Sequence, residues 1–459
     1  MVGSVSTEAV GVRVRDLLLG VEDLRAAQFP VWFDPGFLQA LPEAKVAAAF
    51  EEVRDSLGES PSVEAYQVHP RWVSMALAGA ADTWLITVTV SDEPANLVIG
   101  LRMIPLPKDA VLWEDLVAAP LEAELDTLDA GISARIGLLM TEARSGDRVL
   151  GLAVAVALSG TPIFSAGVGL ASLEPPTAPS SQTVWRAGSI TKPVTALALL
   201  DVASEGLIDL DRPAADYLTS VPLQPLVGCA PPTIRHLLTH TSGLPRHAPG
   251  PRRSPLRLRE ALTAGISPTR APGEVNEYSN LGYGLLGLLL EDVTGESYAA
   301  CVQRRVFDPL EMVSSSISPD PPTAAAAAAC FEAELDWIMP AQPDSVAEIA
   351  AGALASTTFD LLRLGHGVLG TPAMWERQVA VGAPDGGLGL ALTERGGKLL
   401  GWHNGGISGG KAMLLISPAD DIVVAVQANG HPAKLETLAI QILEAIVSPT
   451  LPEAAPHQP

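Results

Sequence analysis

Cysteine is scarce in this chain, which has only Cys229, Cys301 and Cys330 among its 459 residues. Their number is odd and no two of them have the Cys-x-x-Cys spacing, which argues against a disulfide framework and against a cysteine-based zinc site. We interpret the three thiols as buried structural groups in a reducing compartment. The pattern predicts no metal and no other cofactor.

Long hydrophobic runs and basic runs are also missing. No apolar run reaches the roughly 18 residues that would span a bilayer, and the opening MVGSVSTEAVGVRVRDLL lacks the basic, apolar and cleavage regions of a secretory signal. The net charge of −23 would be repelled by nucleic acid and by an anionic membrane surface. We therefore expect a cytoplasmic protein whose partner is a small molecule or another protein.

The first part of the chain has the pattern of a small α+β domain. A length of 459 residues suggests two to three domains. Residues 12–27 and 36–57 carry apolar side chains at helical spacing, and four strand-like segments separated by turn signals follow them. This order predicts a domain over residues 1–105, with the proline-marked stretch 106–120 as a linker. The four expected strands lie near 62–68, 71–78, 83–91 and 96–104.

The remainder, residues 121–450, has strand patterns at both of its ends and helical patterns in its middle. It begins with an expected helix near 121–145 and expected strands at 149–158 and 162–172, and strand-like segments return from residue 387 before a closing helix at 434–447. The pattern predicts one sheet built from both ends of this region around a helical insert. Residues 451–459 are expected to be a flexible tail.

The stretch WRAGSITKPV places Ser189 and Lys192 three residues apart at the start of an apolar run. Because proline is tolerated only in the first turn of a helix, Pro193 predicts a helix that begins close to Ser189, and Gly188 permits a sharp entry. On such a helix the hydroxyl and the amine face the same side. If this turn is buried, a neutral amine can take the serine proton, and the serine N–H can face a developing oxyanion.

The identity of the base favours this chemistry, since only six of the 29 basic residues are lysines and lysine, unlike arginine, can give up its proton. The spacing alone is weak evidence, because a helix-capping Ser189 beside a snorkelling Lys192 fits it equally well. A second copy, Ser408 and Lys411, follows glycines and enters a strand. We interpret that copy as a turn and a solvated strand edge.

Two further motifs offer candidate site residues. EYSN presents Tyr278 and Asn280 just ahead of an apolar helix, where a phenol and an amide suit proton relay and substrate binding, although Asn280 could instead cap the helix. GWHNGG puts His403 before glycines that a ligand can approach, although a lone histidine is more often a turn or core residue. His236 and His240 have metal-ligand spacing on an expected helix, but no third ligand accompanies them.

The motifs WRAGSITK, EYSN and GWHNGG resemble, in order and rough spacing, those of the serine β-lactamase and penicillin-binding-protein superfamily, in its class C-like esterase, transacylase and D-aminopeptidase branch. The likeness covers about residues 121–450. It implies a β-lactamase/transpeptidase-like fold, in which helices flank an antiparallel sheet and an all-helical subdomain is attached. It also implies that Ser189 is the nucleophile, Lys192 the base or its activator, Tyr278 the proton shuttle and Asn280 a contact to substrate or lysine.

The third motif departs from the lactamase pattern. The resemblance puts His403 in the place of the usual lysine, Gly405 where close packing is needed, and the N–H groups of Ser189 and Gly406 in the oxyanion hole. His403 and Asn404 replace a Lys-Thr pair that would bind a β-lactam carboxylate. This loss of fixed positive charge favours esters or amides as substrates.

The N-terminal segment looks similar to the steroid-isomerase-like (cystatin/NTF2-like) domain that precedes a β-lactamase-like domain in a protein of the clavulanic acid cluster. The chain shows no paired acid and tyrosine that would support isomerase chemistry, so we expect a packing or substrate-lid domain. The two-domain likeness suggests a role in natural-product metabolism.

These observations predict an intracellular serine hydrolase or acyltransferase that forms an acyl-Ser189 intermediate with a small-molecule ester or amide. One alternative is a D-Ala-D-Ala peptidase or β-lactamase of the secreted type. Another is a catalytically silent protein that binds a ligand in the same cleft. The sequence leaves open the substrate, the choice between hydrolysis and acyl transfer, and the oligomeric state.

Overall fold

A computed structural model divides the chain into two compact units, which consist of Met1–Glu114 with Ala333–Pro340 and of Asp115–Glu332 with Ala341–Pro459. The segment near residue 337 belongs to the first unit because β14 (Trp337–Pro340) pairs antiparallel with β5 (Val111–Leu112). The boundary at Glu114 lies within the stretch 106–120 that was expected to be a linker.

The structure describes the greater part of both units, and the tail expected at 451–459 lies outside this part. Within it, no helix is both long enough and apolar enough to cross a membrane. Cys301 is a buried free thiol, but Cys229 is partly exposed, so the expectation that all three thiols are buried is wrong for Cys229. Cys330 is not among the described residues.

The residues that the structure describes are 7–18, 34, 39, 43–57, 62–69, 72–78, 83–90, 98–105, 111–112, 121–147, 149–173, 176–248, 258–318, 331–334, 337–340, 348–376, 386–430 and 434–448.

In the described part of the first unit, two helices are followed by an antiparallel meander, as its sequence pattern predicts. The helices are α1 (Thr7–Leu18) and α4 (Glu43–Leu57), so both expected helices exist with different bounds. Val14 and Phe50 on them are buried, as is Met75 in the sheet. The strands pair in the order β1-β2-β3-β4 and are β1 (Ser62–His69), β2 (Trp72–Ala78), β3 (Thr83–Val90) and β4 (Val98–Pro105).

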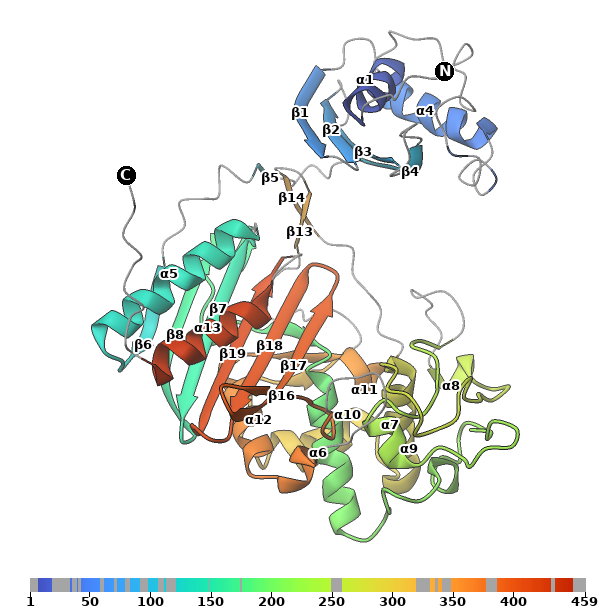
Figure 1. Ribbon diagram of the computed structural model, residues 1–459, viewed down its shortest axis with the longest axis vertical. Helices are drawn as coiled ribbons and strands as arrows, with labels where there is room; N and C mark the ends of the chain where they lie inside the picture. Colours follow the sequence, from blue (N-terminus) through green and yellow to red (C-terminus); the bar gives the residue numbers. More distant parts are fainter. Residues whose placement is uncertain are drawn as a thin grey trace. The chain divides into compact units, whose positions relative to one another are not determined.

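The second unit contains a sheet of seven strands that come from both of its ends (Figure 1), which confirms the predicted arrangement. All neighbours in the sheet are antiparallel. The order is β16 (Ala391–Arg395), β17 (Lys398–Ile407), β18 (Gly410–Ser417), β19 (Ile422–Asn429), β7 (Gly151–Leu158), β8 (Thr161–Gly169) and β6 (Leu121–Asp126).

The prediction of a helix from about residue 121 is wrong at its start. Residues 121–126 form the edge strand β6, which pairs with β8, and helix α5 (Ala130–Gly146) begins only after Asp129. The Asp129 side chain accepts the N–H of Gly131 and so caps the helix at that point. The alternation in LEAELD suits a strand, and the helical pattern that follows concealed it.

Both faces of the seven-stranded sheet are covered. Successive side chains of a strand point to opposite faces, so neighbouring residues of one strand pack into different hydrophobic clusters. On β19, Val423 and Ala425 belong to one hydrophobic cluster while Val424 and Val426 belong to another. Helices α5 and α13 (Leu435–Val447) cover the second face, and Figure 1 shows them lying across the strands. The first face receives α12 (Thr358–Leu369) and the helical subdomain.

The helical subdomain is attached through a small antiparallel sheet in the order β11-β15-β12. Strand β11 (Trp185–Gly188) leads into helix α6 (Thr191–Ser204), and α9 (Asn280–Thr294) and α11 (Ile349–Gly352) contact each other and α6. The remaining elements are β9 (Ser172–Leu173), β10 (Pro176–Thr177), η2 (Ala214–Asp216), α7 (Ile234–Leu238), α8 (Leu258–Ala261), α10 (Tyr298–Val302), η3 (Gln303–Phe307), β12 (Ser316–Ile317), β13 (Phe331–Glu334), β15 (Leu354–Ser356) and η4 (Pro372–Trp375).

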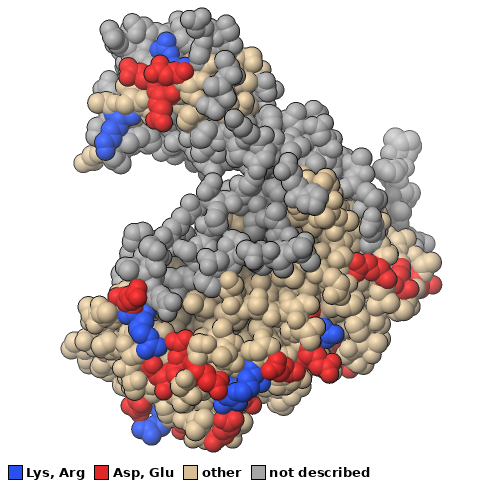
Figure 2. All heavy atoms as spheres, turned by 180° about the vertical axis from the view of Figure 1, so that it is seen from behind, with Lys and Arg blue, Asp and Glu red and all other residues tan. Residues whose placement is uncertain are grey.

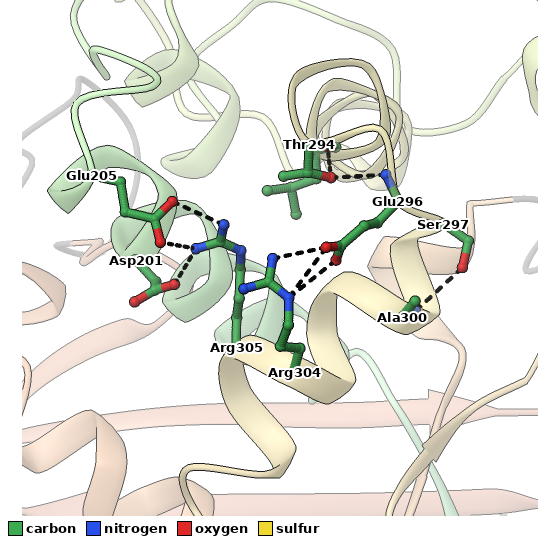
Figure 3. Close-up of polar contacts among 9 residues, drawn as sticks. Asp201, Glu205, Thr294, Glu296, Ser297, Ala300, Arg304 and Arg305 are labelled. Atoms are coloured by element: carbon green, nitrogen blue, oxygen red, sulfur yellow. Dashed lines mark hydrogen bonds and ion pairs between the residues drawn. The ribbon is translucent and has the colours of Figure 1, made fainter.

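Along one edge of the face shown in Figure 2, acidic and basic side chains of the second unit lie side by side. Figure 3 shows one such group, in which Arg305 of η3 binds Asp201 and Glu205 at the end of α6. Arg304 binds Glu296 close by. The pairs join the C-terminal end of α6 to the chain that follows α10.

Helices α6 and α11 are joined by a buried polar contact one turn beyond Lys192. The hydroxyl of Thr195 lies 2.7 Å from the carbonyl oxygen of Ala350 and 2.7 Å from the hydroxyl of Tyr298. Thr195 is fully buried. Since Ala350 precedes Ala351, whose carbonyl contacts Lys192, this contact also holds part of the region around Ser189.

We predict that Thr195→Val destabilises the second unit by about 1–3 kcal/mol, because valine keeps the shape but leaves buried polar partners unsatisfied. The measurement is the free energy of unfolding in urea, followed by tryptophan fluorescence. Thr219→Val, at an exposed position, is the matched control and should change the free energy by no more than about 0.5 kcal/mol. Equal stabilities of the two variants would contradict the role given to Thr195.

Candidate active site

Ser189 lies at the junction of β11 and α6. Gly188 ends the strand with a positive φ of 53°, and α6 begins at Thr191 with Pro193 in its first turn. The Thr191 hydroxyl donates to the Gly188 carbonyl at 2.6 Å and accepts the N–H of Leu354 at 2.9 Å. The expected helix start close to Ser189 is confirmed, and the turn is fixed against strand β15.

The Ser189 hydroxyl contacts two side chains that can exchange protons with it. Lys192 Nζ lies 3.2 Å and Tyr278 OH lies 2.8 Å from Ser189 Oγ. Lys192 is fully buried, and its Nζ also donates to Asn280 Oδ1 and to the carbonyl oxygen of Ala351, both at 2.8 Å. Because two fixed acceptors take two N–H groups, the third position of the amine, an N–H or a lone pair, faces Ser189.

The surroundings hold the pKa of Lys192 well below its usual range. Burial is the largest cause and the Arg246 guanidinium adds to it, while the Glu348 carboxylate acts in the opposite direction. Burial raises the pKa of Tyr278, against the opposing effects of its hydrogen bond to Ser189 and of Arg246. Lys192 is therefore the group suited to accept a proton, and Tyr278 is a neutral hydroxyl that can pass one on.

Asn280 does not cap the helix that follows it. The N-cap of α9 is Ser279, whose side chain accepts the N–H of Gly282 at 2.9 Å. Asn280 is the first residue of the helix, and its side-chain oxygen accepts from Lys192. The alternative interpretation of Asn280 as a capping residue is thus wrong.

His240 supports Tyr278, a role that sequence reasoning missed. It lies beyond the end of α7 with a positive φ of 58°, so the expected helical spacing from His236 does not exist. Its Nδ1 accepts the N–H of Ser279 at 3.1 Å, and its ring centroid lies 4.4 Å from that of Tyr278. His236 instead belongs to the cap of α7, where its Nδ1 accepts the N–H of Thr233. No local sequence signal indicates the contact between His240 and Tyr278.

The third motif lies on β17, which passes beside β11. A Cβ atom on Gly405 would lie 1.9 Å from the carbonyl oxygen of Ala187, so only glycine fits there. A Cβ atom on Gly188 would lie 2.9 Å from Gly406 N, which places this nitrogen beside the residue that precedes Ser189. The close packing expected at Gly405 is present.

His403 points to the same region as Tyr278. Its side chain is 7% exposed, its ring centroid lies 6.4 Å from that of Tyr278, and its Nδ1 lies 2.6 Å from the carbonyl oxygen of Asn404. Burial, followed by the charge of Lys192, lowers the pKa of His403 to about 3, although the bond to Asn404 opposes the shift. The Asn404 side chain contacts Glu436 of α13 instead. His403 is therefore neutral at physiological pH.

The second Ser-x-x-Lys copy does not form a similar pair. Ser408 lies in the turn between β17 and β18, and Lys411 lies within β18 and is partly exposed. Since β18 pairs with both β17 and β19, it is an interior strand, and the expectation of a strand edge is wrong.

Comparisons with known proteins agree with this fold. A family model described as Beta-lactamase matches residues 136–446. Esterase EstB of Burkholderia gladioli is 32% identical over 43% of this chain and 55% of its own length. The D-alanyl-D-alanine-carboxypeptidase/endopeptidase AmpH of Escherichia coli strain K12 is 31% identical over 31% of this chain and 39% of its own. The matches thus span about half the length of these relatives or less.

Solved structures show the same fold. The octameric penicillin-binding protein homologue from Pyrococcus abyssi superposes with a TM-score of 0.62 at 24% identity, over 69% of this chain and 77% of its own. EstCE1, a hydrolase with promiscuous acyltransferase activity, superposes with a TM-score of 0.59 at 20% identity, over 69% of this chain and 98% of its own. The fold and the family match place the chain in the β-lactamase and penicillin-binding-protein superfamily. Within it, this chain belongs to the Beta-lactamase family.

The environment of Lys192 generates a prediction about pH. If the neutral amine is the base, kcat/KM rises as the pH rises through the lowered pKa of Lys192. At pH values below this pKa the amine is protonated, and kcat/KM is low. Asn280→Asp places a carboxylate against this amine. It should raise the pKa and move the acid limb of the profile upward by about one pH unit or more.

The measurement is kcat/KM for p-nitrophenyl acetate from pH 5 to 10. Lys192→Arg, which keeps the charge but cannot deprotonate, should lose activity at every pH. Glu277→Gln, at an exposed position near Tyr278 in sequence, is the control and should leave the acid limb in place. An acid limb that does not move in Asn280→Asp would rule out Lys192 as the titrating base.

Proposed function

We propose that this protein is a serine hydrolase or acyltransferase that acts on a small-molecule ester or amide through an acyl-Ser189 intermediate. The observation that carries the proposal is the position of Ser189 Oγ, within hydrogen-bond distance of a fully buried lysine amine and of a tyrosine hydroxyl. An unactivated serine is a weak nucleophile, and an adjacent base is what activates it.

In the first half-reaction Lys192 takes the hydroxyl proton as Ser189 Oγ attacks the carbonyl carbon. The carbonyl oxygen becomes an oxyanion, for which the N–H groups of Ser189 and Gly406 are the proposed donors; the close approach of Gly406 N to Gly188 supports this assignment. The proton returns through Tyr278 to the leaving oxygen or nitrogen, and the carbon–leaving group bond breaks.

In the second half-reaction an acceptor attacks the acyl-Ser189 carbonyl, and Lys192 and Tyr278 act as base and acid again. Water as the acceptor gives hydrolysis, and a bound alcohol or amine gives acyl transfer. Both outcomes use the same groups, so the acceptor decides between them.

Esters are the favoured substrates. In place of a cationic residue, the third motif presents the neutral His403, and the Asn404 side chain contacts Glu436 instead of the site. A substrate carboxylate would find no fixed positive partner at this motif. The likeness to an esterase supports this choice. The likeness to AmpH makes a D-alanyl-D-alanine peptidase activity the second candidate.

The remaining parts of the proposal rest on the sequence. We place the protein in the cytoplasm and assign it a role in natural-product metabolism. The N-terminal unit is proposed to be a steroid-isomerase-like domain that serves packing or covers the substrate.

We predict that a fluorophosphonate probe labels Ser189, as detected by mass spectrometry of the digested protein. Ser189→Ala should escape labelling and lose roughly 10⁴–10⁶-fold in kcat for p-nitrophenyl esters, since the other groups of the site cannot replace the nucleophile. Ser408→Ala, the other serine in this spacing, is the control and should be labelled like the unaltered protein. Labelling elsewhere, or turnover that survives in Ser189→Ala, would disprove the proposal.

Adding amine or alcohol acceptors to the same assay separates the two outcomes. An acyltransferase forms the acylated acceptor at the expense of the free acid, and a hydrolase does not.

A further inference from the structure

A cavity of about 130 Å³ is lined by His403 and by Tyr278, whose hydroxyl donates to Ser189 Oγ. Leu238, Leu390 and Ala391 give it apolar walls, and none of the described residues that line it is Lys, Arg, Asp or Glu. A cavity of about 150 Å³ is enough to hold a benzene molecule. The cavity therefore suits a neutral group of about the size of one ring, and we call it the leaving-group cavity for the reason given below.

The tautomer of His403 is determined by its neighbour. The carbonyl oxygen of Asn404 can only accept a hydrogen bond, so His403 Nδ1, at 2.6 Å, carries the ring proton. The ring is neutral, and Nε2 therefore has a lone pair and no hydrogen. Among the described residues Nε2 has no hydrogen-bond partner, although the side chain is only 7% exposed.

The other polar side chains that line the cavity already have partners in the protein. Asn276 Nδ2 donates to the carbonyl oxygen of Thr239, and the Thr239 hydroxyl donates to the carbonyl oxygen of Arg235. His240 Nδ1 accepts the N–H of Ser279. Among the described residues His403 Nε2 is thus left without a partner, and its lone pair is open to a donor on a ligand.

The chemistry of Tyr278 indicates which part of a substrate enters the cavity. In the proposed function this hydroxyl returns the proton to the leaving oxygen or nitrogen. Tyr278 and His403 line the same cavity, so the group that departs next to Tyr278 is the group that reaches His403. The acyl part, bonded to Ser189, lies on the other side of the breaking bond.

We propose that the leaving-group cavity selects neutral leaving groups that carry a second O–H or N–H, which donates a hydrogen bond to His403 Nε2. The inference rests on the proposed function and adds a substrate class to it. A carboxylate at the same place is disfavoured, because it has only acceptor oxygens and would direct them at another lone pair in an uncharged cavity.

Three acetate esters with the same acyl group and phenols of similar acidity test this proposal. They are the 3-(hydroxymethyl)phenyl, 3-ethylphenyl and 3-carboxyphenyl esters, which differ in whether they offer a donor, an apolar group or a carboxylate. The hydroxymethyl ester should exceed the ethyl ester in kcat/KM by roughly five- to twentyfold, the usual effect of one hydrogen bond to a buried acceptor. The carboxyphenyl ester should be the poorest. Equal values for the first two, or preference for the carboxylate, would overturn the proposal.

His403→Leu removes the acceptor and should bring the ratio for the hydroxymethyl and ethyl esters to about one. His366→Leu, on the exposed side of α12, is the matched control and should keep the ratio. A ratio that persists in His403→Leu would assign the preference to another group and overturn the proposal.

A binding measurement separates this proposal from the proposed function and needs no variant at position 403. In Ser189→Ala, which cannot form the acyl intermediate, an NMR titration should show 3-(hydroxymethyl)phenol binding roughly five- to twentyfold more tightly than 3-ethylphenol. Equal affinities would overturn the cavity assignment even if Ser189 is the nucleophile. Tighter binding of the first phenol would support it even if Ser189 proves not to be acylated.

Discussion

The burial of one amine is the constraint on which the rest of the site depends. Lys192 has no contact with water, and its two fixed acceptors, Asn280 Oδ1 and the carbonyl oxygen of Ala351, come from helices that follow it by 88 and 159 residues. A protonated amine in such surroundings is disfavoured, and a neutral one needs partners for its N–H groups. The packing of α6 against α9 and α11 provides both conditions, and it directs the remaining position of the amine at Ser189.

The site also requires that β17 come close to β11, the strand before Ser189, and glycine residues permit this approach. The backbones at Gly405 and Ala187 come so close that a methyl group would overlap a carbonyl oxygen, and Gly188 leaves similar room for Gly406. Gly406 N, one of the two proposed oxyanion donors, can therefore lie close to Ser189 although the two residues come from different sheets. The same approach brings His403 beside Tyr278, so that the proposed substrate selection and the proposed proton transfer would use one wall of the site.

The sequence predicted those elements whose positions depend on residues close together in the chain. Pro193 located the start of α6, and strand-like apolar segments located β7, β8 and the last four strands. The carbonyl of Ala351 and the ring of His240 could not be predicted, because their roles depend on the folded path of segments without a motif. The strand at 121–126 was missed for a related reason, because its partner β8 begins 40 residues later in the sequence. A short edge strand directly before a helix is also too short to show a strand pattern that can be told apart from the helical one.

The seven-stranded sheet also has a consequence for synthesis of the protein on the ribosome. Its central pairing joins β7 to β19, and the N–H of Gly151 donates to the side chain of Asn429, which lies 278 positions later in the sequence. Until β19 emerges, β7 presents an unpaired edge and the apolar faces of β7 and β8 have no covering from α13. Such long-range pairing slows folding and exposes aggregation-prone strands. The nascent chain must therefore stay soluble with a half-built sheet, and the site around Ser189 can form only after translation is almost complete.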